Sequence, residues 1–336
     1  MAAVAVGISA CLLGEPVRFD GGHKRSALLC EHLGEHLGEH LGEQQAHDES
    51  GTKSRSSLFR YVSLCPEVAI GMGVPRPPIR LVGNPTDYRA VGVRDPSADL
   101  TERLRDYADN VTQQHLPQLC GYLLMQNSPS CGMAKVKVYS AAGLPNGTGA
   151  GVYAARLMAA SPWLPVEESG RMLDPALREC FVTRVLTLAH WRALQKTGLT
   201  AQRLIAFHSS YKFLLMAHSV SAYRSAGRLL ADLRGDLDAI ANAYFGLLMQ
   251  AIARPASVRG HANALQHLQG YLPGTLEPVS RQALSESIAA YQRREVPLVV
   301  PMSLLRHLLS RFPNEYALAQ VYLDPHPARL GLRKAL

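Results

Sequence analysis

The chain has 336 residues, of which 47% are hydrophobic and 18% are charged. This composition excludes a chain that is disordered throughout, and the length suffices for two ordinary domains. No run of 18 apolar residues occurs, so we expect no membrane span. The start, MAAVAVGISACLLGE, lacks the basic segment of a signal peptide, and we therefore expect a cytoplasmic protein whose thiols stay reduced.

The net charge of +8 is distributed unevenly along the chain. Residues 1–177 carry 16 Lys and Arg against 18 Asp and Glu, whereas residues 178–336 carry 19 against 9. A second half with a net charge of +10 indicates a polyanionic partner, most simply a nucleic acid. The alternative is that these charges only keep the surface soluble.

Residues 1–160 alternate short apolar runs with turns and helical patterns, which is typical of an α/β fold. The expected strands are 3–9, 61–64, 121–125 and 135–139, and the expected helices are 99–114 and 151–160. We expect the strands to form a mostly parallel sheet.

Three of the six cysteines, Cys11, Cys65 and Cys131, follow expected strands and precede loops rich in glycine and proline. In a parallel sheet such loops lie at one edge and can converge. In the turn NSPSCG, Pro129 fixes its own φ, and Gly132 is expected to adopt a backbone conformation closed to other residues. Because no C-x-x-C pair occurs, spacing alone leaves three interpretations open: a shared metal cluster, a nucleophile at Cys131, and cysteines of the core.

Two further segments are weaker candidates. Residues 31–43 read EHLGEHLGEHLGE, which would place His32, His36 and His40 on one face of a helix, at a spacing that suits a metal. A glycine in each repeat weakens a helix, so we favour a solvated insertion over 31–52. The glycine-rich start of the helix at 147–151, GTGAG, is a candidate for an anion-binding wall of a site.

From about residue 180 the pattern is almost entirely helical, which predicts an all-α second domain. The expected helices are 176–195, 200–231, 237–253, 257–272, 280–293 and 301–310. The domains are therefore expected at 1–165 and 181–336, with a proline-punctuated connection at 166–180.

Basic residues and tyrosines interleave on the expected helix 200–231, a pattern that suits contacts with RNA phosphates and bases. The alternative is an amphipathic helix whose charges are merely exposed. The candidate RNA contacts are Arg203, His208, Lys212, Arg224 and Arg228.

Three segments of the first half, ISACLLGEPVRFDGGHKR, LCPEVAIGMGVPRPPIRLV and NSPSCGMAKVKVY, resemble the motifs of the thiouracil desulfidase (TudS) family, in the same order. The second half resembles the YbgA-type helical domain through LIAFHSSYKFLLMAHS, PLVVPMSLLRH and YLDPHPARLGLR. Together the two domains resemble bacterial enzymes that remove sulfur from 4-thiouridine in tRNA.

The resemblance implies a [4Fe-4S] cluster that is held by three cysteines only, here Cys11, Cys65 and Cys131. One iron would then have no protein ligand and would act as a thiophilic Lewis acid toward a thiocarbonyl group. Water would replace sulfur by oxygen, with no net redox change. The remaining cysteines match no ligand position of the family: Cys30, Cys120 and Cys180.

The resemblance also implies two catalytic side chains. Glu67 matches the family's proton-transferring carboxylate. Ser128 matches a serine that orients water or substrate, with Ser130 as the alternative. The family often has lysine just before this turn, where the present chain reads Met-Gln-Asn at 125–127.

Three functions are consistent with these features. The first is a tRNA 4-thiouridine desulfidase whose basic helical domain binds tRNA. The second is a desulfidase of free thiouracil or thiolated nucleosides. The third is a non-catalytic protein that binds RNA or senses the state of a cluster.

Overall fold

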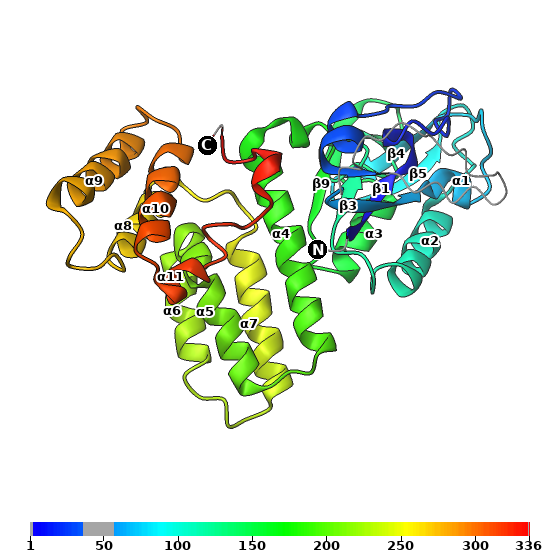
Figure 1. The fold of residues 1–336 in the computed structure, drawn as a ribbon. Coiled ribbons are helices and arrows are strands. Elements are labelled where there is room, and N and C mark those ends of the chain that lie inside the picture. Colours follow the sequence, from blue (N-terminus) through cyan, green and yellow to red (C-terminus); the bar gives the residue numbers. More distant parts are fainter. Residues whose placement is uncertain (1–2, 36–56, 335) are drawn as a thin grey trace, which may run out of the picture. The chain divides into compact units, whose positions relative to one another are not determined.

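The structure is a computed structural model that describes residues 3–35, 57–334 and 336. The chain divides into two compact units, Met1–Arg171 and Met172–Leu336. The first unit is α/β and the second is helical, which confirms the fold class expected from the sequence (Figure 1). Among the described residues, no helix is long and apolar enough to cross a membrane.

A five-stranded parallel sheet forms the centre of the first unit. Its order is β2 (Gly34–Glu35), β3 (Phe59–Leu64), β1 (Val4–Ser9), β6 (Tyr122–Leu124) and β9 (Val166–Glu168). The apolar sequence VAVGIS of β1 is almost wholly buried, as expected for a central strand covered on both faces. Since β1 pairs with both β3 and β6, the carboxyl ends of these three strands are adjacent.

A second sheet has four strands, of which only one, expected at 135–139, was predicted from the sequence. Its order is β5 (Asp87–Gly92), β4 (Ile79–Asn84), β7 (Val136–Tyr139) and β8 (Pro145–Gly149). The β4–β7 pair is parallel, whereas β4–β5 and β7–β8 are antiparallel hairpins. At the β4–β5 turn, the Asn84 side chain accepts hydrogen bonds from the backbone N–H groups of Thr86 and Asp87, which closes the hairpin.

The described part of the first unit also contains the α-helices α1 (Pro66–Ala69), α2 (Thr101–Gln114) and α3 (Val152–Ala160), and a π-helix at Leu28–Leu33. Helices α2 and α3 pack against each other and lie below the strands in the view of Figure 1. Tyr107 of α2 stacks on Tyr153 of α3 with ring centroids 5.7 Å apart. The hydroxyl of Tyr153 lies 3.1 Å from that of Tyr122 in β6, so α3 is tied to the central sheet.

The second unit consists of helices, most of which begin at a polar capping residue such as Asp174, Thr200 or Asp236. They are α4 (Pro175–Lys196), α5 (Ala201–His218), α6 (Val220–Leu229), α7 (Leu237–Ala251), α8 (Val258–Gln269), α9 (Pro278–Gln292), α10 (Val299–Arg311) and α11 (Glu315–Leu318). The segment expected as a connection, 166–180, contains β9 and the first turn of α4.

The prediction of a single helix over 200–231 is wrong, because the helix is interrupted at Ser219. This residue is extended, with φ −158° and ψ 108°, and it ends α5 and begins α6. Its hydroxyl accepts a hydrogen bond from the backbone N–H of Ala222 at 3.2 Å. A serine that caps a new helix offsets the loss of helical hydrogen bonds at the interruption. Apolar periodicity, from which the helix was predicted, does not reveal such a cap.

The C-terminal segment returns to α4 and forms a buried ion pair there (Figure 1). The Arg333 Nε donates to Glu179 Oε1 at 2.8 Å, and the side chain of His326 lies 3.6 Å from the same oxygen. Burial alone would raise the pKa of Glu179, but Arg333 and His326 outweigh burial and hold this pKa well below its ordinary value. The pair therefore stabilises the folded unit at neutral pH, and its contribution is lost as the pH falls through the lowered pKa.

We predict that Glu179→Ala lowers the free energy of unfolding by about 3–5 kcal/mol, because it leaves the buried Arg333 guanidinium unpaired. Urea unfolding followed through the fluorescence of the buried Trp191 measures this change. The control is Glu295→Ala, which removes an exposed partner of Arg293 and should leave the midpoint unchanged. Equal midpoints for both variants would contradict the prediction.

Candidate functional site

Three loops that follow β1, β3 and β6 enclose one cavity of about 390 Å³ in the first unit. Cys11, Cys65 and Cys131, one from each loop, line this cavity. The parallel pairing of β3, β1 and β6 brings the three loops to the same edge of the sheet. The convergence that the sequence predicted for these three cysteines is therefore present in the structure.

Cys11 lies in a short 3-10 turn, Ala10–Leu12, directly after β1. Its carbonyl oxygen accepts a hydrogen bond from the Lys24 N–H at 2.8 Å, so the following loop folds back over the strand end. The side chain is buried. Burial and the neighbouring Cys65 raise the pKa of the Cys11 thiol to about 11, while Arg18 acts in the opposite direction.

Cys65 is the residue that precedes α1, and Pro66 occupies the first position of that helix. Its Sγ lies 4.0 Å from the carbonyl oxygen of Val17, in the loop that follows Cys11. Burial raises the pKa of this thiol, and the nearby Arg76 lowers it in part. Because Glu67 is in the first turn of α1, its carboxylate faces the same cavity.

Cys131 lies in the turn Ser-Pro-Ser-Cys-Gly, whose shape depends on Ser128. The Ser128 Oγ accepts hydrogen bonds from the backbone N–H groups of Ser130 at 3.3 Å and Cys131 at 3.1 Å. Asn127, with φ 58°, is the turn residue in the left-handed region. The expectation that Gly132 supplies an unusual backbone conformation is wrong. Glycine is needed there for space, since a Cβ would lie 2.3 Å from the Val136 side chain.

The beginning of α3 holds the cysteine turn in place. The N–H groups of Gly151, Val152 and Ala154 donate to carbonyl oxygens of the turn at 2.7–3.0 Å. A Cβ at Gly151 would lie 2.5 Å from the carbonyl group of Ser130, so only glycine permits this approach. The glycine-rich segment 147–151 does not line the cavity; Gly147–Gly149 lie in β8, and Gly151 supports the cysteine turn from outside.

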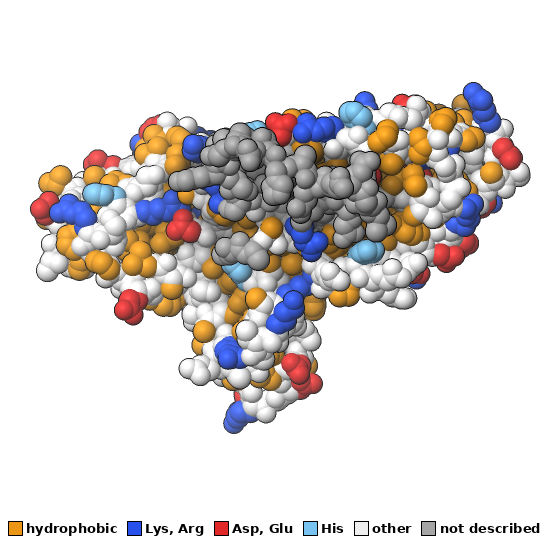
Figure 2. Space-filling view, turned by 45° about the vertical axis from the view of Figure 1, so that its right-hand side comes forward, with side chains coloured by type: hydrophobic (Ala, Val, Ile, Leu, Met, Phe, Trp, Pro, Cys, Tyr) orange, Lys and Arg blue, Asp and Glu red, His pale blue; other side chains and the backbone are white. Residues whose placement is uncertain are grey.

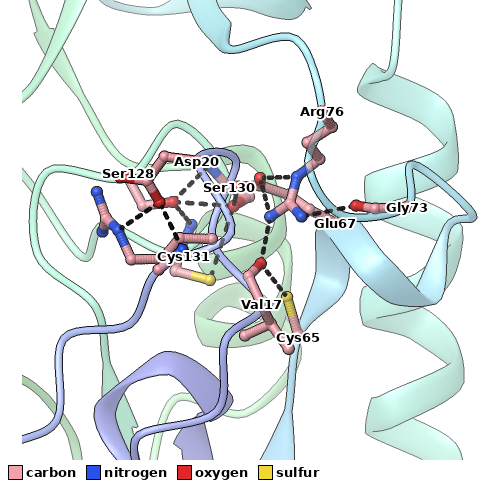
Figure 3. A network of polar contacts seen from close by, with 11 residues as sticks. Val17, Asp20, Cys65, Glu67, Gly73, Arg76, Ser128, Ser130 and Cys131 are labelled. Atoms are coloured by element: carbon pink, nitrogen blue, oxygen red, sulfur yellow. Dashed lines mark hydrogen bonds and ion pairs between the residues drawn. The ribbon is translucent and has the colours of Figure 1, made fainter.

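A buried polar network crosses the cavity wall (Figure 3). The Arg76 Nε donates to Glu67 Oε2 at 2.8 Å, and Nη2 lies 2.7 Å from the same oxygen. The other carboxylate oxygen, Oε1, accepts from the hydroxyl of Ser130 at 2.5 Å. Ser130 in turn lies 2.9 Å from the Ser128 Oγ and 3.7 Å from the Cys131 Sγ. Glu67 is thus connected to two of the three cysteine loops.

The donor set is of the kind that iron–sulfur clusters use, because the irons of such clusters are held by cysteine thiolates. Among the described residues, no three His, Cys, Asp or Glu side chains are grouped closely enough to hold one metal ion. The ligands of a polynuclear iron–sulfur cluster bind different irons and lie farther apart than the ligands of one ion. Here three cysteines, one from each of three loops, line the same cavity. Arg18 and Lys24 also line the cavity and would offset part of the charge of three thiolates, whereas the charge of Arg76 is paired with Glu67.

The structure separates the two candidate serines. Ser128 is half-buried, lines the cavity and organises the turn, whereas Ser130 is fully buried and contacts Glu67. Sequence reasoning missed Arg76, which carries the network. Its only local signal was an arginine between prolines in GVPRPP, and a single arginine in a loop says nothing about its partner.

Some sequence candidates lie elsewhere. Cys30 is half-buried and its Sγ donates to the Leu12 carbonyl at 3.6 Å, outside the cavity. Cys120 and Cys180 are buried, as expected, and neither lines the cavity. His32 is exposed, while His36 and His40, with most of the segment 31–52, lie outside the described residues.

The candidate RNA contacts on α5 are engaged within the second unit. Arg203 Nη1 donates to the carbonyl of Gly198 at 2.7 Å. His208 packs edge-on against Tyr244, and burial lowers its pKa. The Lys212 Nζ lies between 5.7 and 5.9 Å from three aromatic ring centroids, those of Phe213, Tyr223 and Tyr316. These contacts stabilise the helical fold and leave less of each side chain for a partner.

Arg224 and Arg228 are exposed, as Arg203 also is, and they lie four residues apart on α6. On the face shown in Figure 2, the Lys and Arg side chains of the described residues are interspersed with acidic and apolar side chains.

Two family descriptions match the chain. Residues 6–169 match the 2-thiouracil desulfurase family, and residues 212–327 match a family of unknown function, DUF1722. The Escherichia coli (strain K12) protein YbgA is 33% identical over 152 residues, which are 45% of this chain and 90% of YbgA. The chain therefore belongs to the YbgA family, and residues 6–169 carry a domain of the 2-thiouracil desulfurase type. The first unit is a desulfurase domain, which is an enzyme domain, and the second is a YbgA-type domain.

A solved structure of the [4Fe-4S]-dependent thiouracil desulfidase TudS is 26% identical to the chain. It covers 52% of this chain and 94% of that protein, with a TM-score of 0.34. The resemblance of the three cysteine motifs to the desulfidase family is thus confirmed through the family match over the desulfurase domain.

We predict that Gly151→Ala displaces the Cys131 turn, because the added Cβ meets backbone atoms that cannot rotate away. The variant should unfold at a lower urea concentration and take up less iron on anaerobic reconstitution. Gly227→Ala is the control: its Cβ meets open space within α6, and it should be neutral or stabilising by about 0.5–1 kcal/mol. Full iron uptake by Gly151→Ala would contradict the prediction.

Proposed function

We propose that this protein is a desulfidase that replaces the thiocarbonyl sulfur of a thiouracil group by oxygen. The observation that carries the proposal is the single cavity in which three cysteines from three loops lie beside the Glu67 carboxylate. The net change consumes one water molecule and releases sulfide and protons, with no electrons exchanged. It therefore needs a group that binds sulfur and a group that moves protons.

The proposed ligands of a [4Fe-4S] cluster are Cys11, Cys65 and Cys131. When bound by three cysteines, such a cluster supplies one iron without a protein ligand, a thiophilic Lewis acid. The thiols must lose their protons to bind it, and Arg18 and Arg76 nearby favour the resulting negative charge.

Glu67 is the proposed proton acceptor for the attacking water. Its Oε1 lies on the side of the Cys131 turn, where Ser130 donates to it. Ser128, which is half-buried and lines the cavity, is the proposed group that orients water or substrate by hydrogen bonding. The charge that the family often places just before the turn has a counterpart here in Arg18 and Lys24, which reach the cavity from the first loop.

Two carriers of the thiouracil group are candidates. The description of the matched family favours the first candidate, free thiouracil. The net charge of +10 over residues 178–336 favours the second candidate, 4-thiouridine in tRNA, with the YbgA-type domain as the tRNA-binding part. A nucleotide within tRNA would have to unstack from its neighbours to enter a cavity of this kind.

The cluster proposal is tested by replacing each cysteine. Cys11→Ala, Cys65→Ala and Cys131→Ala should each lose most bound iron and acid-labile sulfide after anaerobic reconstitution. Cys30→Ala and Cys120→Ala are matched controls, since both residues lie in the same unit but do not line the cavity. Retention of the cluster by all three cavity variants would overturn the ligand assignment.

The reaction is tested with the reconstituted protein, with 2-thiouracil and 4-thiouracil as free bases, and with tRNA that contains 4-thiouridine. Loss of the near-UV thiocarbonyl absorbance should occur with the wild type and not with Cys131→Ala. Loss with tRNA alone selects the tRNA candidate, and loss with the free base alone selects the first candidate. Absence of turnover on both substrates by a fully loaded protein would overturn the desulfidase proposal and favour a binding or sensing role.

The tRNA candidate makes a separate electrostatic prediction. Arg224→Gln/Arg228→Gln should lower the slope of log binding constant against log salt by about 1 to 2, because each arginine would neutralise one phosphate. Arg105→Gln/Arg156→Gln removes the same charge from exposed positions of the first unit and should leave the slope nearly unchanged. Equal slopes for both double variants would place the contact elsewhere.

A further inference from the structure

Arg76 is the most buried cation of the cavity wall. The whole residue is 7% exposed, whereas Arg18 is half-buried and Lys24 is exposed. Arg76 comes from the loop between α1 and β4, so it belongs to none of the three cysteine turns. A buried guanidinium without partners would be strongly destabilising, and its contacts therefore indicate what it is for.

All three nitrogens of the guanidinium donate to protein acceptors (Figure 3). Nε and Nη2 both contact the Oε2 atom of Glu67. Nη1 donates to the Gly73 carbonyl at 2.9 Å, and Nη2 also donates to the Val17 carbonyl at 2.8 Å. The planar guanidinium thereby joins Glu67 to the loop after Cys11 in one fixed geometry.

The backbone strengthens this connection. The Arg76 N–H donates to the Phe19 carbonyl at 2.9 Å, so Arg76 is held to the first loop by its main chain and its side chain. The Val17 carbonyl that accepts from Nη2 is also within 4.0 Å of the Cys65 Sγ. Arg76 is consequently fixed before any substrate arrives.

Both contacts from Arg76 to Glu67 use the same carboxylate oxygen. Because Oε2 is occupied, only Oε1 is directed toward Ser130 and the Cys131 turn. A guanidinium whose nitrogens all serve protein acceptors is poorly placed to bind substrate. Among the groups that Arg76 contacts, Glu67 is the proposed catalytic one, and the orientation of its carboxylate is the route by which Arg76 would affect the rate.

We propose that Arg76 is the positioning residue for Glu67, holding Oε2 so that Oε1 faces the reacting groups. The inference rests on the proposed desulfidase function. According to this proposal, the orientation of Glu67 depends on a planar contact through two guanidinium nitrogens, and a positive charge alone would not replace it.

The test replaces Arg76 by lysine, which keeps the charge and loses the planar contact. With the reconstituted protein, kcat for the substrate that the wild type turns over should fall roughly 10- to 100-fold, as expected for a misplaced catalytic group. KM, the bound iron, and the dissociation constant of the desulfurated product of that substrate should change by less than about threefold. Arg333→Lys is the matched control, since Arg333 is also buried, also pairs with a glutamate and also donates to a backbone carbonyl. It should leave kcat unchanged.

Glu67→Gln provides the second arm. If Arg76 acts through Glu67, adding Arg76→Lys to Glu67→Gln should reduce the rate by less than about twofold in single-turnover measurements. A full additional loss would overturn the proposal. The proposal would also be overturned if Arg76→Lys alone left kcat unchanged. It would be overturned if KM and the product dissociation constant rose together, or if the variant lost the cluster.

An infrared measurement separates this proposal from the proposed function. The carboxylate bands of Glu67, obtained as the difference between wild type and Glu67→Gln, should shift in Arg76→Lys and not in Arg333→Lys. Absence of the shift overturns the positioning role whatever the activity. A shift in a protein that turns over neither thiouracil nor tRNA would overturn the desulfidase function alone.

Discussion

The parallel pairing of β3, β1 and β6 is the constraint on which the rest of the first unit depends. Parallel strands place all their carboxyl ends at one edge, so the loops that follow them must meet there. Cys11, Cys65 and Cys131 are far apart in the sequence, yet each comes shortly after one of these strands. The cavity follows from this topology together with the tight turns that keep each cysteine near its strand.

Around that cavity, the fold supports each loop by a different means. The loop after Cys11 is tied down by Arg76, the cysteine before α1 is fixed by Pro66, and the Cys131 turn is held by Ser128 and by the beginning of α3. These supports are backbone contacts or buried side chains, which lose little entropy when a ligand binds. A site built in this way would suit the proposed proton transfer at Glu67, because the carboxylate is already held in place.

Charge has different uses in the two units. In the first, a few cations surround thiols whose burial opposes ionisation, and they would stabilise the thiolates that a cluster requires. In the second, Glu179 and Arg333 form a buried pair, His208 and Lys212 pack on aromatic rings, and the exposed charge of α6 comes from Arg224 and Arg228. The net charge of a domain thus overstates how many of its cations are available to a polyanion.

The sequence by itself determined the α/β and helical halves, the strands that precede Cys11, Cys65 and Cys131, and the family to which each half belongs. These are local features, carried by apolar periodicity, turn residues and long motifs. Only the tertiary structure decided that Gly132 and Gly151 are needed for space and that Ser219 divides a helix. It also decided that Arg76 contacts one carboxylate oxygen of Glu67 while Ser130 contacts the other. Each of these depends on atoms that are distant along the chain or on competition between a cap and a helix. Such contacts leave no periodic trace in the sequence, because a single side chain is compatible with many partners until the backbone brings one of them within reach.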